Sequence, residues 1–264
     1  MGEERIYDQE RNGPKAMRID IATLFVDMCE TVMNESIIGR AQKAGFLEVH
    51  CHHIRDYTKD KHRRTDDCPY GGGKGMLMQA DPIYRTYLHV CSQLGARPYV
   101  VYMSPQGKVL NQQKSLELSK LDNLLIICGH YEGVDERLIE EIVDEEISIG
   151  DFVLTGGELA ALVLADSVAR LCEGVLAADE CFTEESHFNG LLEYPHYTRP
   201  PVWQDREVPQ VLVSGHHANI ERWRRHKSLE RTYDKRPDLL EKAPLTAEDR
   251  AYLAQYAATG KPEE

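Results

Sequence analysis

The chain has 264 residues, enough for one large domain or two modest ones with a full hydrophobic core. Its apolar content of 42% and charged content of 28% are those of an ordinary globular protein, and no apolar run approaches the ~20 residues of a membrane span or the core of a secretory leader. The formal net charge of −13 argues against unspecific nucleic-acid binding, because phosphate contacts need cations.

Strands and helices are predicted to alternate along the first half of the chain. Residues 1–16 are polar and without pattern, and we expect a flexible extension. A strand is predicted for residues 19–25, then a helix for 31–44 that ends at Gly45, the usual residue after a helix. Residues 46–54 alternate as a second strand does.

A long loop, residues 55–76, follows and is first charged and then rich in glycine. Its run Gly71–Gly75 lacks the spacing of a Walker phosphate loop. A helix is predicted for 81–94, a strand for 97–103 followed by a turn, and a short helix for 111–119. A loop of this length indicates either function or disorder.

The stretch from 121 to 171 gives the strongest indication of the fold and of the position of the site. Two apolar runs bounded by glycine, 124–128 and 147–154, are typical of buried strands, and segments with helical spacing follow each of them. Such alternation favours an α/β fold with a parallel sheet covered by helices. Open parallel sheets bind small molecules at the carboxyl ends of their strands, so we expect the site beside Gly129 and Gly157.

The last third of the chain changes character. Residues 173–201 show no sustained period and end in a proline cluster, which indicates an interdomain linker. Residues 202–264 are predicted to form a small, mainly helical domain, with its clearest helices at 218–227 and 247–258. The sheet domain therefore spans 17–172.

The cysteines and histidines indicate neither a disulfide framework nor a metal site. Seven cysteines form no C-x-x-C pair, which is typical of reduced thiols in a cytoplasmic protein. Of the run 50–53 (HCHH), strand alternation places only His50 and His52 on one face, and no second cluster has zinc spacing. We therefore predict no metal ligand.

Seven motifs then occur in one order along residues 17–240: MRIDIATLF, DKHRRTDDCPYGGGKGM, MSPQGK, GHYEGVDER, SIGDFVLTGGELA, LLEYPHYTRP and SGHHANIERWRR. In this the chain resembles the bacterial tRNA (guanine-N1)-methyltransferases of the SPOUT class. The resemblance implies a deep trefoil knot in the sheet domain and methyl transfer from S-adenosylmethionine to N1 of guanine 37 in tRNA. It also implies a homodimer with a composite site, and it leaves a need for Mg²⁺ open.

The resemblance also assigns the cofactor pocket, in which the acids Glu132 and Asp151 could balance the positive sulfonium. The residues it places there are Tyr102, Pro105, Gly107, Gly129, Tyr131, Glu132, Ile149, Gly150, Asp151, Phe152, Val153, Leu154, Gly156 and Gly157. On their charge alone, the two acids can equally be a helix N-terminal acid and a solvated strand end.

Two residues match catalytic positions of the family. Glu185 stands where the family commonly carries an Asp that removes the N1 proton, although Glu184 and Asp179 are neighbouring candidates. Arg170 matches the family's Arg that faces the developing charge on O6. From the residues alone, an acid in a solvated linker and an Arg at a helix C-terminus are the plainer interpretations.

The basic residues cluster locally: 221–236 holds seven Lys or Arg and 55–64 holds five. The resemblance implies that the helical domain grips the anticodon stem and that the glycine-rich loop holds the guanine. The substrate residues it implies are Tyr70, Gly71, Gly72, Gly73, Ser186, Tyr197, Arg199, Arg222 and Arg225. A non-catalytic RNA-binding protein on the same scaffold is the alternative; a nucleotide hydrolase would need a Walker or metal constellation, which is absent.

Overall fold

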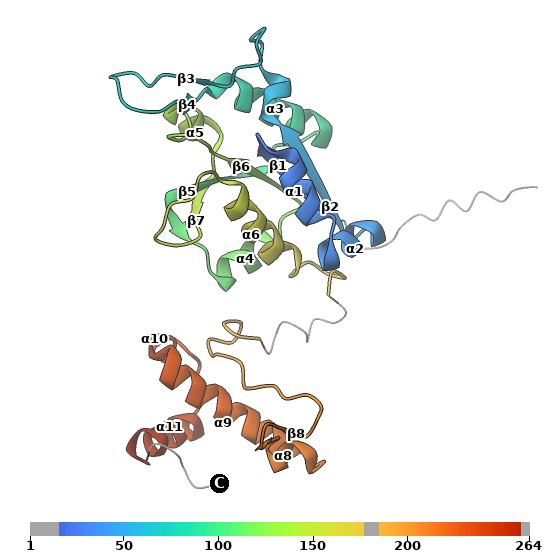
Figure 1. The fold of residues 1–264 in the computed structure, drawn as a ribbon, viewed down its shortest axis with the longest axis vertical. Helices are drawn as coiled ribbons and strands as arrows, with labels where there is room; N and C mark the ends of the chain where they lie inside the picture. The colour runs from blue at the N-terminus through green and yellow to red at the C-terminus, as the bar shows by residue number, and fades with distance from the viewer. Residues whose placement is uncertain (1–15, 177–184, 260–264) are drawn as a thin grey trace, which may run out of the picture. The chain divides into compact units, whose positions relative to one another are not determined.

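A computed structural model describes residues 16–176 and 185–259 of the chain. They form two compact units that divide between Ala177 and Ala178 (Figure 1). The expected extension 1–16 lies outside the described residues except for Ala16. Over the two described ranges, no helix combines the length and apolar character that a membrane crossing requires.

The first unit is built on a five-stranded sheet in which every pairing is parallel, in the order β2-β1-β6-β5-β7. Its strands are β1 (Met17–Thr23), β2 (Leu47–His53), β5 (Tyr99–Val109), β6 (Asn123–Cys128) and β7 (Glu145–Ser148). A short antiparallel pair, β3 (Asp66–Asp67) with β4 (Leu77–Met78), stands apart from the sheet. The predicted α/β fold with a parallel sheet is confirmed.

Helices cover both faces of this sheet (Figure 1). They are α1 (Val26–Met33), α2 (Ser36–Ala44), α3 (Ala80–Leu94), α4 (Gln112–Leu118), α5 (Glu136–Ile142) and α6 (Glu158–Ala169), with a short 3-10 turn at Ile54–Tyr57. Along β6, Leu124 and Ile126 enter the core with α1, α2, α4 and α6, whereas Leu125 and Ile127 enter the core with α3 and α5. The period of two along a strand thus builds both cores from one apolar run.

Three elements differ from the sequence-based prediction. The helix expected over 31–44 is two helices, because the Asn34 side chain donates to the Glu30 carbonyl and the backbone at Ser36 turns to φ 53°. The strand expected over 147–154 ends at Ser148, whose hydroxyl bonds both the N–H and the C=O of Gly150. The expected turn at 104–107 lies within β5, as an irregularity in its pairing with β7.

The second unit is mainly helical. Its elements are α8 (Gln210–Val213), α9 (His217–Lys235), α10 (Pro237–Leu240), α11 (Ala247–Thr259) and an antiparallel pair, β8 (Val202–Trp203) with β9 (Arg206–Glu207). Residues 185–201, which the sequence assigns to a linker, belong to this unit: Leu191 is buried in its core, and Leu192 N–H bonds the Thr232 hydroxyl at 2.9 Å.

Candidate functional site

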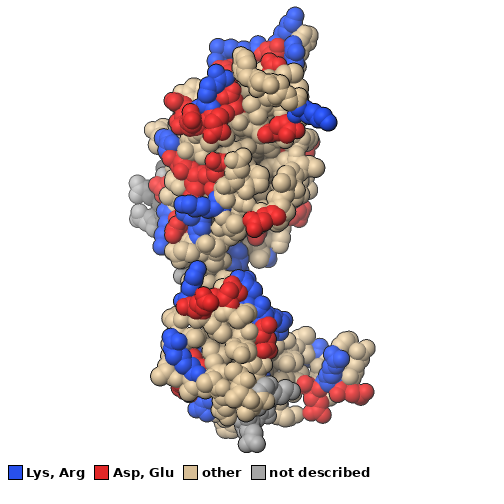
Figure 2. Space-filling model, turned by 90° about the vertical axis from the view of Figure 1, so that its left-hand side faces the viewer, with Lys and Arg blue, Asp and Glu red and all other residues tan. Residues whose placement is uncertain are grey.

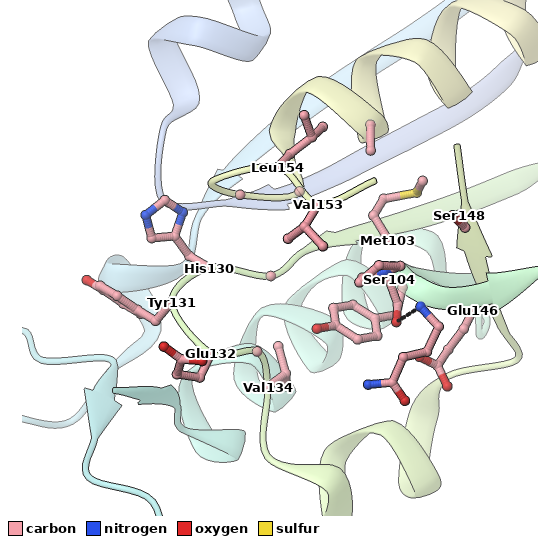
Figure 3. A pocket seen from close by; sticks show the side chains of 18 of the residues that line it. Met103, Ser104, His130, Tyr131, Glu132, Val134, Glu146, Ser148, Val153 and Leu154 are labelled. Atoms are coloured by element: carbon pink, nitrogen blue, oxygen red, sulfur yellow. Dashed lines mark hydrogen bonds between the residues drawn. The ribbon is translucent and has the colours of Figure 1, made fainter. Parts of the chain in front are cut away.

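A cavity of about 520 Å³ lies at the carboxyl ends of β5, β6 and β7 (Figure 3). Three segments supply most of its lining: residues 102–106 within β5, the turn 129–134 after β6, and residues 146–157 from β7 and the loop after it. Parallel strands bring these carboxyl ends to one edge of the sheet, as the sequence predicted. The cavity has the size of a small-molecule site.

Glycines allow the two turns of the cavity to touch. Gly157 N–H donates to the Gly129 carbonyl at 2.8 Å, and a Cβ at Gly157 would lie 2.9 Å from the Cα of Cys128. A Cβ at Gly156 would meet His130 Nδ1 at 2.5 Å. Because backbone atoms occupy the space of a side chain at Gly157, only glycine permits the close approach at that position.

Tyr102 forms one wall, with 7% of its surface exposed. A Cβ at Gly129 would lie 2.7 Å from the Tyr102 hydroxyl, so the phenol fills the space beside that glycine. Burial, and then the negative charge of Glu146, raise the pKa of Tyr102 to about 12. The phenol is therefore protonated at neutral pH and can donate a hydrogen bond.

The structure brings most of the expected cofactor residues together on this cavity. Those that line it are Tyr102, Pro105, Gly129, Tyr131, Glu132, Ile149, Phe152, Val153, Leu154, Gly156 and Gly157. Gly107 lies instead against the backbone of Glu146, Gly150 adopts φ 147° beside the Phe152 ring, and Asp151 is exposed. Asp151 is thus not one of the carboxylates that border the cavity.

Several lining residues were not selected from the sequence. Among them are Met103, Ser104, Gln106, His130, Glu136, Glu146, Ser148 and Thr155. Ser104 and Gln106 flank Pro105, a residue expected in the pocket, and this adjacency could have suggested them. Glu136 and Glu146 lie in the acidic stretch 132–151, where the sequence gives no sign of which carboxylates face inward.

The charge of the cavity is negative. Glu132, Glu136 and Glu146 line it, and the described lining residues include no Lys or Arg. Glu132 and Glu146 reach the cavity from opposite sides (Figure 3). Such a lining favours a cationic or neutral ligand over a phosphate-bearing one.

The glycine-rich loop, residues 55–76, ends beside this cavity. Residues 76–78 pair with the turn after β6: Glu132 N–H donates to Met76 O at 3.0 Å, and Met78 N–H donates to Gly133 O at 2.9 Å. Gly75 lies directly against the Glu132 carboxylate. Tyr70 and the expected guanine-holding glycines, Gly71, Gly72 and Gly73, are exposed.

The two expected catalytic residues lie in different units. Arg170 follows α6 as its C-cap, where its N–H donates to Asp166 O at 3.1 Å, and it is half-buried. Glu185 is the first described residue of the second unit, half-buried, and its carbonyl accepts from Phe188 N–H at 3.3 Å. Glu184 and Asp179, the neighbouring candidates, lie outside the described residues.

The expected RNA-binding residues of the second unit differ in their surroundings. Arg199 and Arg222 are exposed, and Tyr197 is 49% exposed with its ring 6.3 Å from that of Trp223. Arg225 instead makes two hydrogen bonds to Asp249, of 3.0 and 2.8 Å. The Ser186 hydroxyl accepts from Glu193 N–H at 3.0 Å. Arg225 and Ser186 thus have structural contacts of their own.

Basic and acidic side chains are interspersed on the face of each unit that Figure 2 displays. On this face, the net charge of −13 therefore does not produce a uniformly acidic surface. In the histidine run, His52 Nε2 lies 2.6 Å from Asp20 Oδ1 and His50 is exposed; residues 16–176 and 185–259 hold no cluster of three potential metal ligands.

Comparisons with known proteins agree on one family. The model of the family described as tRNA (Guanine-1)-methyltransferase TrmD matches residues 17–242. A tRNA (guanine-N(1)-)-methyltransferase of Ruminiclostridium cellulolyticum is 59% identical over 86% of this chain and 98% of its own. Relatives of the same name from Chloroflexus aggregans and Dehalococcoides mccartyi are 51% and 48% identical, each over 94% of this chain and over 98% and 100% of their own.

Proposed function

Because this chain belongs to the tRNA (guanine-1)-methyltransferase family and methylates N1 of a guanine in tRNA, we propose that its methyl donor is S-adenosylmethionine and its target guanine 37, beside the anticodon. The observation that carries the choice of donor is the cavity at the carboxyl ends of β5, β6 and β7. Its glycine-built walls admit close backbone contacts, and its charge suits a sulfonium.

The cavity suits this donor better than a nucleotide phosphate. Its carboxylates repel phosphate and attract the donor's positive sulfur and amino group. The loop Ile149–Leu154 and the turn at Gly129–Glu132 would hold the adenosine by backbone groups and by the apolar walls of Phe152 and Leu154. The bound donor supplies an activated methyl group; the residues of the chain have only to orient it and the guanine.

In this proposal two side chains act on the guanine. Glu185 takes the N1 proton, which is worth roughly 10²–10⁴-fold in rate for a positioned base. Arg170 donates to O6 as negative charge develops there, worth on the order of 3 kcal/mol in a site that excludes water. Arginine suits this role because it stays charged at all physiological pH values.

We further propose a homodimer in which one copy supplies the cavity and Arg170, and the other supplies Glu185 and the helical unit. Helices α1 and α6 contact each other and leave large apolar side chains exposed: Met28, Val32, Leu159 and Val163. An exposed apolar face of this kind supports protein–protein contact. Helix α6 carries apolar residues on all sides, as a helix covered on both faces does.

We also propose that the sheet is knotted in the SPOUT manner. In support, β6 lies between β1 and β5, although β5 precedes it in the chain, and the loop after β7 returns to bond Gly129. A knot is an exception to the usual rules of chain connection, so it would be a property of this class and not of parallel sheets in general.

The tRNA would be held at two places. Tyr70, Gly71, Gly72 and Gly73 are exposed in the glycine-rich loop and would receive the guanine, while Tyr197, Arg199 and Arg222 are exposed on the second unit and would contact the anticodon stem. Arginines contact phosphate, and an exposed tyrosine can stack on an unpaired base.

The test is methyl transfer from labelled S-adenosylmethionine to a tRNA transcript with G at position 37, compared with the same transcript carrying A. We expect transfer to the first and none to the second. Transfer to both, or transfer to a guanine elsewhere in the A variant, would contradict the proposed target. Binding of the transcript without any transfer would favour the alternative of a non-catalytic RNA-binding protein.

A further inference from the structure

In the acidic stretch between β6 and the end of β7, some carboxylates form ion pairs, whereas others, Glu132 among them, line the cavity. Asp135, Asp144 and Glu145 are paired with Arg137, Arg97 and Lys114, at 2.6, 2.8 and 3.1 Å respectively. Glu136 and Glu146 line the cavity, and no salt bridge to either occurs among the described residues. Their negative charge is therefore not neutralised locally by Lys or Arg.

The negative charge reaches the interior of the cavity. The Tyr102 hydroxyl lies inside, against Gly129, and both Glu146 and Glu136 contribute to the upward shift of its pKa, after burial. The two carboxylates come from different elements, β7 and the first turn of α5, so they act on the cavity from two directions. A cation bound there would be stabilised by both.

We propose that Glu136 and Glu146 distinguish the methyl donor from its demethylated product by stabilising the positive charge on the donor's sulfur. This inference rests on the proposed donor. During transfer the S–CH₃ bond breaks with its electron pair left on sulfur, a C–N1 bond forms, and the N1 proton leaves to the base. The product S-adenosylhomocysteine is therefore a neutral thioether that carries one positive charge fewer than the donor.

The electrostatic attraction between the cavity and its ligand therefore falls when the methyl group is transferred, because the sulfur loses its positive charge. In general, two opposite unit charges roughly 6–8 Å apart, at an effective dielectric constant of about 20–40, change a binding affinity roughly 5- to 100-fold. Because both glutamates are at least partly exposed, we expect roughly a three- to tenfold effect on affinity for each. Adenosine and the amino acid tail are common to both ligands, so only the charge at sulfur separates them. Release of the product is favoured in the same proportion.

The experiment is isothermal titration of the full chain with three ligands: S-adenosylmethionine, S-adenosylhomocysteine and sinefungin, in which a protonated amine stands near the place of the sulfonium. The variants are Glu136→Gln and Glu146→Gln, which keep the size and one acceptor oxygen of the side chain but remove its charge. Glu140→Gln is the matched control, because Glu140 is exposed on the same helix as Glu136 and does not line the cavity.

We expect each cavity variant to weaken the two cationic ligands roughly three- to tenfold while the affinity for S-adenosylhomocysteine changes less than about twofold. Glu140→Gln should leave all three affinities unchanged. Equal weakening of all three ligands would assign the glutamates a packing role and overturn the inference, as would unchanged affinities in both variants. If the wild-type chain bound neither the donor nor the product, the proposed donor itself would be wrong.

Discussion

Thr23 and Glu158 are joined by a buried hydrogen bond of 2.9 Å, from the threonine hydroxyl to the glutamate carboxylate. Thr23 ends β1 and Glu158 opens α6, directly after the glycines that line the cavity. The Thr23 hydroxyl also accepts the N–H of Phe25 at 2.9 Å. A carboxylate 4% exposed needs such partners, and the helix N-terminus adds a favourable dipole.

Thr23→Val should therefore destabilise the first unit by about 1–3 kcal/mol, because it leaves a buried carboxylate without its donor while keeping the shape of the side chain. Amide hydrogen exchange of β1 and β6 measures this. Thr23→Ser, which keeps the hydroxyl, is the control and should retain most of the protection. Equal protection in the valine and serine variants would show that the hydrogen bond contributes nothing.

Gly129→Ala should weaken the binding of S-adenosylmethionine at least about tenfold, since the new methyl group would meet the Tyr102 ring and displace it into the cavity. Isothermal titration measures the affinity. Tyr102→Leu in the same chain removes the ring from the path of that methyl group and should restore part of the affinity. Full affinity in Gly129→Ala alone would contradict the packing described for this wall.

The ion pair between Arg225 and Asp249 should make the stability of the second unit depend on pH. The hydrogen bonds from Arg225 lower the pKa of Asp249 to about 2, below the ~3.9 of an unfolded chain. Because the folded pKa is depressed, the stabilisation is present above about pH 4 and is lost as the pH falls from about 4 to about 2. After allowance for the partial exposure of Arg225, it amounts to about 1–2 kcal/mol.

Urea unfolding followed by tryptophan fluorescence measures this directly, because both tryptophans of the chain, Trp203 and Trp223, lie in the second unit. Arg225→Ala should lower stability at pH 7 and flatten its dependence on pH below 4. Arg222→Ala, a change of an exposed arginine on the same helix, should leave stability unchanged and weaken tRNA binding. If Arg222→Ala lowered stability and Arg225→Ala weakened only tRNA binding, the structural role assigned to Arg225 and the tRNA-binding role assigned to Arg222 would both be wrong.

Arg170→Ala and Glu185→Ala should each cut single-turnover methyl transfer by roughly a hundredfold or more, the scale of a lost general base, while the affinity for S-adenosylmethionine is unchanged. Glu185→Asp is the conservative control and should retain part of the rate. A nearly wild-type rate in Glu185→Ala would move the base to Glu184 or Asp179.

The sheet was predictable from two patterns: the apolar run 124–128, bounded by Gly129, lies in the strand 123–128, and the alternating run 46–54 contains the strand 47–53. The end of β7 was not, because the hydroxyl of Ser148 closes a turn on Gly150 within an apolar run that continues to Leu154. Periodicity reports which residues are apolar and carries no information on where a side chain bonds the backbone.

The cavity was predictable in position and only partly in chemistry. Glycines after strands indicated the edge of the sheet where the cavity lies. Glu136 and Glu146, however, could not be distinguished in the sequence from the paired acids around them, because the direction in which each side chain points depends on the tertiary structure. Arg225 illustrates the same limit: its partner Asp249 lies 24 positions away, on another helix, and no local pattern connects them.

Isothermal titration of the purified chain with S-adenosylmethionine, and with ATP as a phosphate-bearing adenosine ligand of similar size, tests the central claim most directly. The account predicts saturable binding of S-adenosylmethionine that Gly129→Ala weakens, and no measurable binding of ATP to the acidic cavity. Binding of ATP in place of S-adenosylmethionine, or binding of S-adenosylmethionine that is indifferent to Gly129, would contradict it.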